Sequence, residues 1–353
     1  MQIECEVLEL RTRHAFRIAR AGSYGGPEEG VPAPPRRSVW VRLRDGDGVE
    51  GWGEAAPLPY YGETADTVVA VLPWVAELVE AASGGDAFAL ERIEGALTAA
   101  LGGNASVKSA VSAALHDLVG KRLGVPVWQW LGLDPGRAPR SSFTLGLDEP
   151  ERMREKLRET AHYPILKVKV GTARDAEVLA LLREERPDAV VRVDANTAWT
   201  AKEALARVPL LEEYGVELLE QPVAAADVEG LRLVRERTRI PVIADESCRT
   251  AADVPRLAGA VDGINIKLAK CGSLREALRM VHVARAHGLR VMLGCMVETT
   301  LGIAAALQLA PLADDVDLDG AALLAEDPFV GPGLERDGRL RFNAEPGLGV
   351  RKR

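Results

Sequence analysis

The sequence predicts an α/β protein in which a smaller α+β domain precedes a (β/α)8-type barrel. From about residue 141 onward, eight short apolar runs alternate with amphipathic stretches, which is the pattern of repeated βα units. The residues before this point lack the alternation. Eight such units favour a closed barrel over an open doubly wound sheet. A chain of 353 residues is long enough for both parts.

The N-terminal part of the chain is predicted to contain both strands and helices. Residues 2–10 and 36–48 alternate in the manner of strands, and the second run ends in an Asp-Gly turn. Three stretches then carry apolar residues at helical spacing: 66–82, 87–101 and 106–124. Two Gly/Pro-rich segments, 19–35 and 51–64, are either surface loops or a lid over the barrel mouth.

The barrel strands follow in order, each a short apolar run. They are 141–147, 165–171, 190–196, 216–222, 241–247, 263–270, 290–296 and 315–320. Helices are expected between them at 151–162, 173–185, 201–214, 227–237 and 274–288, the last closed by Gly288. We take 1–122 as the N-terminal domain, 123–322 as the barrel and 323–353 as a C-terminal segment that returns to the first domain.

Composition and charge argue against several classes of protein. The chain is 47% hydrophobic and 27% charged, and no apolar run is long enough to span a bilayer. A formal net charge of -8 without a dense Lys/Arg block argues against a nucleic-acid surface. The chain starts with a strand-like alternation instead of a secretory signal, and its four cysteines lie far apart. We therefore expect a cytoplasmic protein that binds small molecules and neither nucleic acid nor membranes.

Three successive predicted barrel strands end in a carboxylate: Asp194, Glu220 and Asp245. Active sites of such barrels lie at the carboxyl ends of the strands, so the three side chains should converge on one rim. Bare carboxylates repel one another in a low-dielectric pocket, and a divalent cation resolves this. A set of oxygens without His or Cys suits Mg²⁺, with Mn²⁺ as the alternative, and not zinc. Each carboxylate could instead cap the helix that follows it.

Lys167 and Lys169 interrupt the otherwise apolar strand ILKVKVG and, being two residues apart, point to the same face. Lys267 ends the sixth strand, which lies opposite the second in an eight-stranded barrel, so a central ligand would meet an amine from each side. A second ammonium and a metal lower the pKa of a lysine, which suits a base. Lys169 is the better base, while Lys167, one layer deeper, would tune it and touch a substrate carboxylate. The lysines could also serve only as ion-pair partners or extend to the rim.

This assembly suits proton transfer next to a carboxylate. A metal that binds a substrate carboxylate can hold the enediolate dianion formed when the neighbouring α-proton leaves. With an amine on each face, one removes the proton and the other returns it. The residues thus predict a 1,1-proton transfer that inverts a stereocentre.

Five motifs occur in an order that resembles the muconate-lactonizing subgroup of the enolase superfamily: KVK (167–169), VDAN (193–196), EQP (220–222), ADES (244–247) and NIKLAK (265–270). The resemblance covers essentially the whole chain. It implies a modified (β/α)7β TIM-type barrel with the N-terminal domain as its cap. It also implies Mg²⁺ on the three carboxylates and acid/base lysines at Lys169 and Lys267, the pairing generally known for this superfamily. No histidine ends the seventh strand, which argues against a mandelate-racemase-type base.

The eighth predicted strand, DVDLDG, presents Asp317 and Asp319 on one face. This pair, with GCMVET after the seventh strand, is similar to dipeptide epimerases, where two aspartates hold the substrate's α-ammonium. The aspartates could also be turn residues that close the barrel. Three further substrate-binding residues are assigned with them: Thr144, Cys295 and Met296.

The substrate implied by this resemblance is an L-Ala-L/D-Xaa dipeptide inverted at its C-terminal residue. Arg17 and Arg20 precede the glycine-rich segment, and Arg20 resembles an arginine that contacts an acidic second residue in Ala-Glu epimerases. Either arginine could instead form a surface ion pair. Xaa stays open between Glu and a hydrophobic residue, and we expect a homo-oligomer.

Other functions remain compatible with the same residues. Within the superfamily they are muconate cycloisomerase, o-succinylbenzoate synthase and N-acylamino acid racemase, whose substrates carry no free amino terminus. A Schiff-base aldolase using Lys267 is an alternative of another class. A binding or scaffold protein is the non-enzyme alternative, which the intact set of buried charges disfavours.

Overall fold

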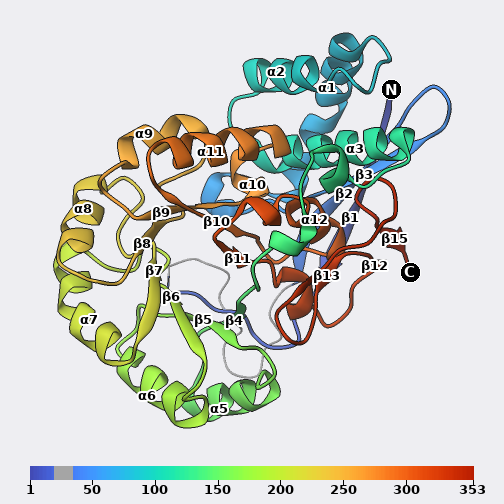
Figure 1. Ribbon diagram of the computed structural model, residues 1–353. Coiled ribbons are helices and arrows are strands. Elements are labelled where there is room, and N and C mark those ends of the chain that lie inside the picture. The colour runs from blue at the N-terminus through green and yellow to red at the C-terminus, as the bar shows by residue number, and fades with distance from the viewer. Residues whose placement is uncertain (20–34) are drawn as a thin grey trace.

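The computed structural model describes residues 1–19 and 35–353. Figure 1 shows a ring of helices around a barrel of strands, with a smaller domain of strands and helices beside it. Arg20 and nearly all of the predicted lid segment 19–35 lie outside the described residues. None of the helices in the described part of the chain is long and apolar enough to cross a membrane.

The larger unit is an eight-stranded parallel barrel in which each strand pairs with the next along the chain. Its strands are β4 (Phe143–Leu145), β5 (Ile165–Lys169), β6 (Val190–Asp194), β7 (Val216–Glu220), β8 (Val242–Ala244), β9 (Gly263–Ile266), β10 (Arg290–Gly294) and β11 (Asp315–Asp317). The barrel closes where Ser141, just before β4, pairs in parallel with Val316 of β11. The predicted fold class, an α/β barrel of this type, is confirmed.

Helices cover the outside of the barrel: α5 (Pro150–Glu159), α6 (Asp175–Glu185), α7 (Ala201–Glu213), α8 (Val228–Glu236), α9 (Val254–Leu257), α10 (Leu268–Cys271), α11 (Leu274–Ala286) and α12 (Thr300–Leu307). Cap residues fix several of their starts; the Thr200 hydroxyl, for example, accepts a hydrogen bond from the backbone N–H of Glu203. The sequence alone predicts no helix at α12. Its residues TLGIAAAL are nearly all buried, so the helix has no polar face to give a periodic signal.

The smaller domain is an antiparallel sheet packed against helices. Its strands β1 (Gln2–Leu10), β2 (Arg36–Arg44) and β3 (Glu50–Ala55) pair in chain order. Helices α1 (Ala65–Ser83), α2 (Leu90–Ala100) and α3 (Ala105–Leu123) follow. Apolar side chains from β2 and α3, including Val41, Leu115 and Leu118, form a core separate from that of the barrel.

Two glycines bring β3 into close contact with α3. A Cβ added to Gly51 would overlap the carbonyl oxygen of Ala114, and one added to Gly53 would overlap that of Ala110. The glycines and prolines of residues 51–64 predict a surface loop or lid. That interpretation is wrong for residues 51–55, which belong to β3, because the glycines permit close packing and not a turn.

The C-terminal segment runs back toward the smaller domain (Figure 1). It contains short strands: β12 (Phe329–Val330), β13 (Gly333–Leu334), β14 (Leu340–Arg341) and β15 (Arg351–Lys352). The Phe329 ring packs edge-on against Trp40 of β2, with ring centroids 5.2 Å apart. The backbone N–H of Leu348 donates to Asp117 Oδ1 of α3 at 2.7 Å. The domain boundaries at residues 122 and 322 stay predictions.

The packing of β3 on α3 predicts that Gly53→Ala lowers the free energy of unfolding by about 1–3 kcal/mol, because the backbone must move to admit the methyl group. Urea denaturation followed by circular dichroism measures the change. Gly95→Ala in α2 is the matched control: nothing lies within 4 Å of the added Cβ, and alanine should stabilise the helix by ~0.5–1 kcal/mol. Equal urea midpoints for Gly53→Ala and the unmodified protein would contradict the packing argument.

Candidate active site

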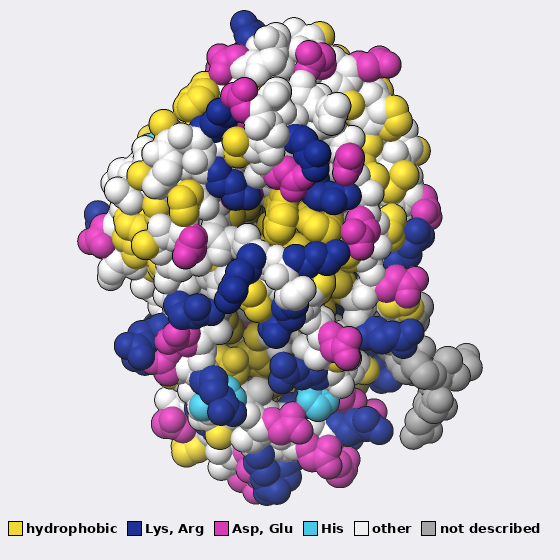
Figure 2. All heavy atoms as spheres, turned by 90° about the vertical axis from the view of Figure 1, so that its right-hand side faces the viewer, with side chains coloured by type: hydrophobic (Ala, Val, Ile, Leu, Met, Phe, Trp, Pro, Cys, Tyr) yellow, Lys and Arg dark blue, Asp and Glu magenta, His cyan; other side chains and the backbone are white. Residues whose placement is uncertain are grey.

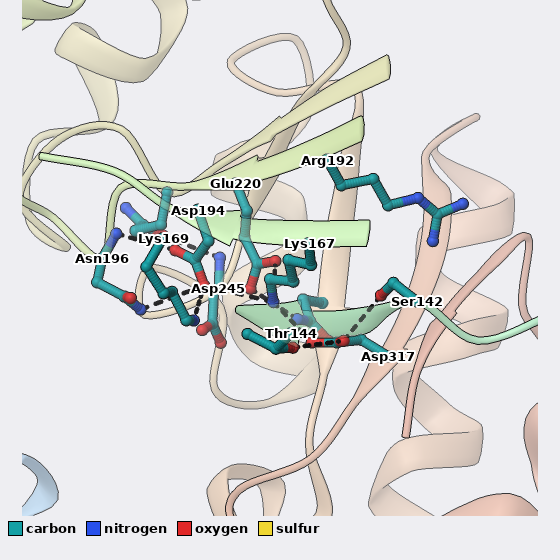
Figure 3. Close-up of polar contacts among 12 residues, drawn as sticks. Ser142, Thr144, Lys167, Lys169, Arg192, Asp194, Asn196, Glu220, Asp245 and Asp317 are labelled. Carbon is teal, nitrogen blue, oxygen red and sulfur yellow. Dashed lines mark hydrogen bonds and ion pairs between the residues drawn. The ribbon is translucent and has the colours of Figure 1, made fainter. Parts of the chain in front are cut away.

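Three carboxylates meet at the carboxyl end of the barrel, as the sequence predicted (Figure 3). Asp194 ends β6, Glu220 ends β7, and Asp245 follows β8 directly. One oxygen from each lies within 4.8 Å of the others. All three side chains are at most 2% exposed. Strand register produces this arrangement, because Asp194 pairs with Glu220 across the β6–β7 ladder.

Neighbouring amides hold two of the carboxylates and the backbone of the third residue in place. The backbone N–H of Asn196 donates to Asp194 Oδ1 at 2.9 Å, and Asn265 Nδ2 donates to Glu220 Oε1 at 2.8 Å. Gln221 Oε1 accepts from the backbone N–H of Asp245 at 2.8 Å. Asn196 and Gln221 have positive φ angles of 45° and 35°, a strained backbone that is typical of functional sites.

The two lysines of β5 point into this cluster, as predicted from their spacing. Lys167 Nζ lies 2.6 Å from Glu220 Oε2, 3.3 Å from Asp194 Oδ2 and 2.7 Å from Asp317 Oδ2. Lys169 lies two residues after Lys167, nearer the carboxyl end of β5. Its Nζ donates to Asp194 Oδ2 at 2.6 Å. Figure 3 shows both side chains directed from β5 toward the carboxylates of the neighbouring strands.

Lys267 approaches the same cluster from β9. Its Nζ donates to Asp245 Oδ2 at 2.8 Å. Lys169 and Lys267 therefore each contact a different carboxylate of the group, one from the β5 side and one from the β9 side. Both line a single cavity, so a ligand in it would meet an amine from two directions.

The carboxylates determine the charge state of these lysines. Burial opposes the charged form of Lys167, but Asp317, Glu220 and Asp194 outweigh it and hold its pKa well above the usual range. For Lys267, Asp245 and Glu220 likewise outweigh burial and raise the pKa. The sequence analysis expected lowered lysine pKa values. That expectation assumed a metal on the carboxylates and stays a prediction; with the carboxylates themselves as partners of Lys167 and Lys267, opposite charges favour the ammonium form.

The pKa values of two carboxylates in the cluster shift in different directions. Burial opposes ionisation of Asp245, but Lys267 and Lys270 overcome it and hold the pKa of Asp245 well below its usual range. Burial and the neighbouring Asp194 raise the pKa of Glu220. The cluster thus depends on cations for its ionised state, and its all-oxygen donor set fits a hard divalent cation such as Mg²⁺.

Lys270 is a member of the cluster that the sequence analysis did not assign. Its side chain is fully buried, and its ammonium contacts Asp245 Oδ1. It also donates to the carbonyl oxygens of Asp245, Cys248 and Asn265. The residue lies in the NIKLAK motif, three positions after Lys267 and within α10. The alternation of side chains along a strand does not predict a site role for Lys270, because this residue lies in a helical turn.

Asp317 and Asp319 lie together at the seam between β11 and β4. Asp317 Oδ1 accepts from the Ser142 hydroxyl at 2.8 Å and the Thr144 hydroxyl at 3.2 Å, while Asp319 Oδ2 accepts from the Thr144 backbone N–H at 2.5 Å. Burial opposes ionisation of Asp317, but Lys167 lowers its pKa to about 2. Burial and Asp317 raise the pKa of Asp319 to about 7. The pKa values of these two neighbouring carboxyls therefore differ widely.

One cavity of about 310 Å³ is lined by Lys169, Asp245 and Lys267 from this cluster. Predicted substrate-binding residues in its wall are Thr144, Lys167, Cys295, Met296, Asp317 and Asp319. The smaller domain and its loops supply Phe16, Ile18, Arg36 and Leu58–Tyr61. Part of the predicted lid segment 51–64 thus reaches the cavity. No described histidine lines it, in keeping with the sequence analysis.

A second pair of buried carboxyls flanks the cavity and was also missed. Glu298 of the GCMVET motif accepts from the backbone N–H of Met296 at 2.8 Å, and burial with Glu54 raises its pKa to about 8. Glu54, from β3, accepts from the backbone N–H groups of Thr299 and Gly302 at the start of α12. The pair joins the smaller domain to the cavity wall; only the structure reveals this, since the two residues are 244 positions apart by subtraction.

Comparisons with known proteins agree with this geometry. Residues 34–132 match the mandelate racemase / muconate lactonizing enzyme N-terminal domain, and residues 151–352 match the enolase C-terminal domain-like family. The chain is 39% identical over 346 residues to an L-Ala-D/L-Glu epimerase of Bacteroides thetaiotaomicron, covering 98% of this chain and 86% of that protein. It is 40% identical over 350 residues to an L-Ala-D/L-amino acid epimerase of Maribacter sp., covering 99% of each.

The fold has a close counterpart among solved structures. The dipeptide epimerase of Enterococcus faecalis, solved with Mg and the dipeptide L-Leu-L-Tyr, superposes with a TM-score of 0.89 at 33% identity. The match covers 99% of this chain and 98% of that one. The superfamily predicted from the motifs is confirmed. The chain belongs to the mandelate racemase / muconate lactonizing enzyme family, with an enolase-like barrel as its C-terminal domain.

Proposed function

We propose that this protein is a Mg²⁺-dependent dipeptide epimerase that inverts the α-carbon of the C-terminal residue of an L-Ala-L/D-Xaa dipeptide. The observation that carries the proposal is one cavity lined by Lys169, Lys267 and the pair Asp317 and Asp319. Relatives over the full length of the chain are epimerases of such dipeptides, and one related structure holds Mg and a dipeptide.

The two lysines act as a pair of acid and base on opposite faces of the substrate. In one direction Lys169, as the free amine, takes the α-proton, and the Lys267 ammonium delivers a proton to the other face; the reverse direction exchanges these roles. Asp194, Glu220 and Asp245 are the residues that would hold the metal. When bound, Mg²⁺ offsets the negative charge that develops on the substrate carboxylate as the proton leaves.

Asp319 is the better placed of the two aspartates to hold the substrate's α-ammonium. The Asp317 carboxylate already contacts Lys167 and accepts hydrogen bonds from Ser142 and Thr144. Asp319 lines the same cavity and has the Thr144 N–H as its close donor. An acidic pair disfavours the rival reactions of the superfamily, because a muconate or succinylbenzoate precursor would bring further carboxylates to it.

Several finer points stay predictions. The cavity wall offers apolar partners in Phe16, Ile18 and Leu58 and a guanidinium in Arg36, so Xaa stays open between hydrophobic residues and Glu. The predicted contact of Arg20 with substrate concerns a residue outside the described part of the chain. Use of Mn²⁺, a cytoplasmic location and a homo-oligomeric state also stay predictions.

The function is tested by incubating the protein with Mg²⁺ and a library of L-Ala-L-Xaa dipeptides in D₂O. We expect mass spectrometry to find deuterium at the α-carbon of the C-terminal residue in a subset of dipeptides. EDTA should abolish the exchange, and Mg²⁺ should restore it. If no dipeptide gains deuterium while calorimetry shows bound Mg²⁺, the proposal is wrong, and N-acylated amino acids become the substrates to test.

The two-lysine assignment predicts a stereochemical signature. Lys169→Ala should lower the rate of epimerisation by about 10²–10⁴-fold, because one proton acceptor is lost. The α-proton of the diastereomer that faces Lys267 should still exchange with D₂O without inversion, and Lys267→Ala should show the opposite preference. Chiral chromatography with mass spectrometry separates these outcomes. Lys202→Ala, on the exposed surface of α7, is the matched control. Loss of exchange from both diastereomers in Lys169→Ala would argue for a structural role.

The raised pKa of Asp319 predicts a pH dependence of substrate binding. As pH rises through about 7, Asp319 loses its proton and gains the charge that attracts an ammonium, so kcat/KM for a free dipeptide should increase. Asp319→Asn should raise KM by about 10-fold to 100-fold and remove this rise. N-acetylated dipeptides are the control substrate. An equal loss with these substrates would refute the ammonium contact.

A further inference from the structure

A second cavity, of about 480 Å³, lies outside the barrel next to β4. In the described residues after β11, the chain forms only the short 3-10 helix η5 (Gly320–Leu323) before the C-terminal strands. A complete barrel would place an eighth helix against β11 and β4. Residues 12–16, the end of α5 and the β13–β14 hairpin surround this place without filling it.

The second cavity is separate from the candidate active site although the two adjoin. Thr144 directs its hydroxyl to Asp317 inside the barrel. Its neighbours on β4, Phe143 and Leu145, therefore face outward, where they line the second cavity. The two cavities share Phe16, Thr144 and Leu323 as common wall.

The charge of the second cavity is positive. Arg13 donates through Nε to the carbonyl oxygen of Leu324, and neither Arg13 nor Arg336 forms an ion pair with any described carboxylate. The nearby acids already have partners: Glu159 pairs with His14 at 2.8 Å, and Asp148 pairs with Lys156 at 2.7 Å. The face that bears the C-terminal strands shows Lys and Arg side chains bordering hollows with hydrophobic floors (Figure 2).

One wall of the second cavity is aromatic and carries the hydroxyl of Tyr163. Tyr163 stacks on Phe143 at 4.4 Å between ring centroids, and the His162 ring lies 4.3 Å from it on a tilt. Tyr163 is 7% exposed, and its hydroxyl makes no hydrogen bond within the described residues. Arg13 and Arg336 line the same cavity as this ring. Burial and Asp319 raise the pKa of Tyr163, and the two guanidinium groups oppose the rise.

We propose that the second cavity is a binding site for a small organic carboxylate with an apolar body. Arg336 and Arg13 would take the carboxylate, for which a guanidinium fork is well suited, and the Tyr163 hydroxyl would donate a third hydrogen bond. Phe143, Leu145 and Leu334 supply apolar surface for the rest of the ligand. This site is independent of the epimerase reaction.

The experiment is isothermal calorimetry of the full-length protein with Mg²⁺, using phenylacetate as the probe and phenylacetamide as its neutral counterpart. We expect saturable binding of phenylacetate and roughly tenfold weaker binding of phenylacetamide, which lacks the charge. Arg336→Gln should weaken phenylacetate binding about tenfold, and Tyr163→Phe, which keeps the stacked ring, should weaken it roughly threefold.

Two matched variants make the result specific. Arg339→Gln changes an exposed arginine of the same hairpin that pairs with Asp337 and lines neither cavity, so binding should be unchanged. Lys267→Ala removes a cation from the first cavity and should also leave binding unchanged. Absence of saturable binding, equal affinity in Arg336→Gln, or loss of binding in Lys267→Ala would each overturn the proposal. Inorganic phosphate binding as tightly as phenylacetate would overturn the assigned ligand class.

Discussion

The structure depends on mutual neutralisation of buried charges at the mouth of the barrel. Four carboxylates and four ammonium groups lie there, each too costly to bury alone: Asp194, Glu220, Asp245 and Asp317 with Lys167, Lys169, Lys267 and Lys270. Charge balance orients groups that come from six of the barrel strands or from the turns directly after them. It also makes the cluster responsive, because any added cation must displace ammonium groups from the carboxylates they now contact.

An added cation would change the protonation state of the lysines, which matters for their role as acid and base. With the carboxylates as partners, Lys167 and Lys267 hold their protons firmly, which is the wrong state for a base. A divalent cation on the carboxylates would take over their neutralisation and lower the pKa of nearby lysines, as a second positive charge does. Metal and substrate are therefore expected to act together in preparing the base. Lys270, held by three carbonyl oxygens, stays fixed and keeps Asp245 oriented.

Features with a regular sequence period could be predicted from the sequence. Features that depend on tertiary packing could not. Apolar strands that end in Asp194, Glu220 and Asp245 are visible because each breaks its run at the same point of a βα repeat. Lys270 enters from a helical turn, so no strand pattern identifies it. Strand β3 was not predicted because Gly51 and Gly53 are residues typical of loops. Their role in close packing is evident only from their contact with α3. Helix α12 was not predicted because a helix buried on all sides shows no amphipathic periodicity in its sequence.

The seam where the barrel closes links the fold to its specificity. Among the described residues only the short helix η5 follows β11, and β4 and β11 are held together partly by polar contacts: Ser142 and Thr144 donate to the carboxylates of Asp317 and Asp319. The aspartates that we propose to bind the substrate's ammonium are thus also residues that close the barrel. Changing either aspartate to a residue that cannot accept these hydrogen bonds leaves buried donors unsatisfied, which costs stability as well as affinity. The residues at this seam are therefore restricted by the stability of the barrel as well as by substrate binding.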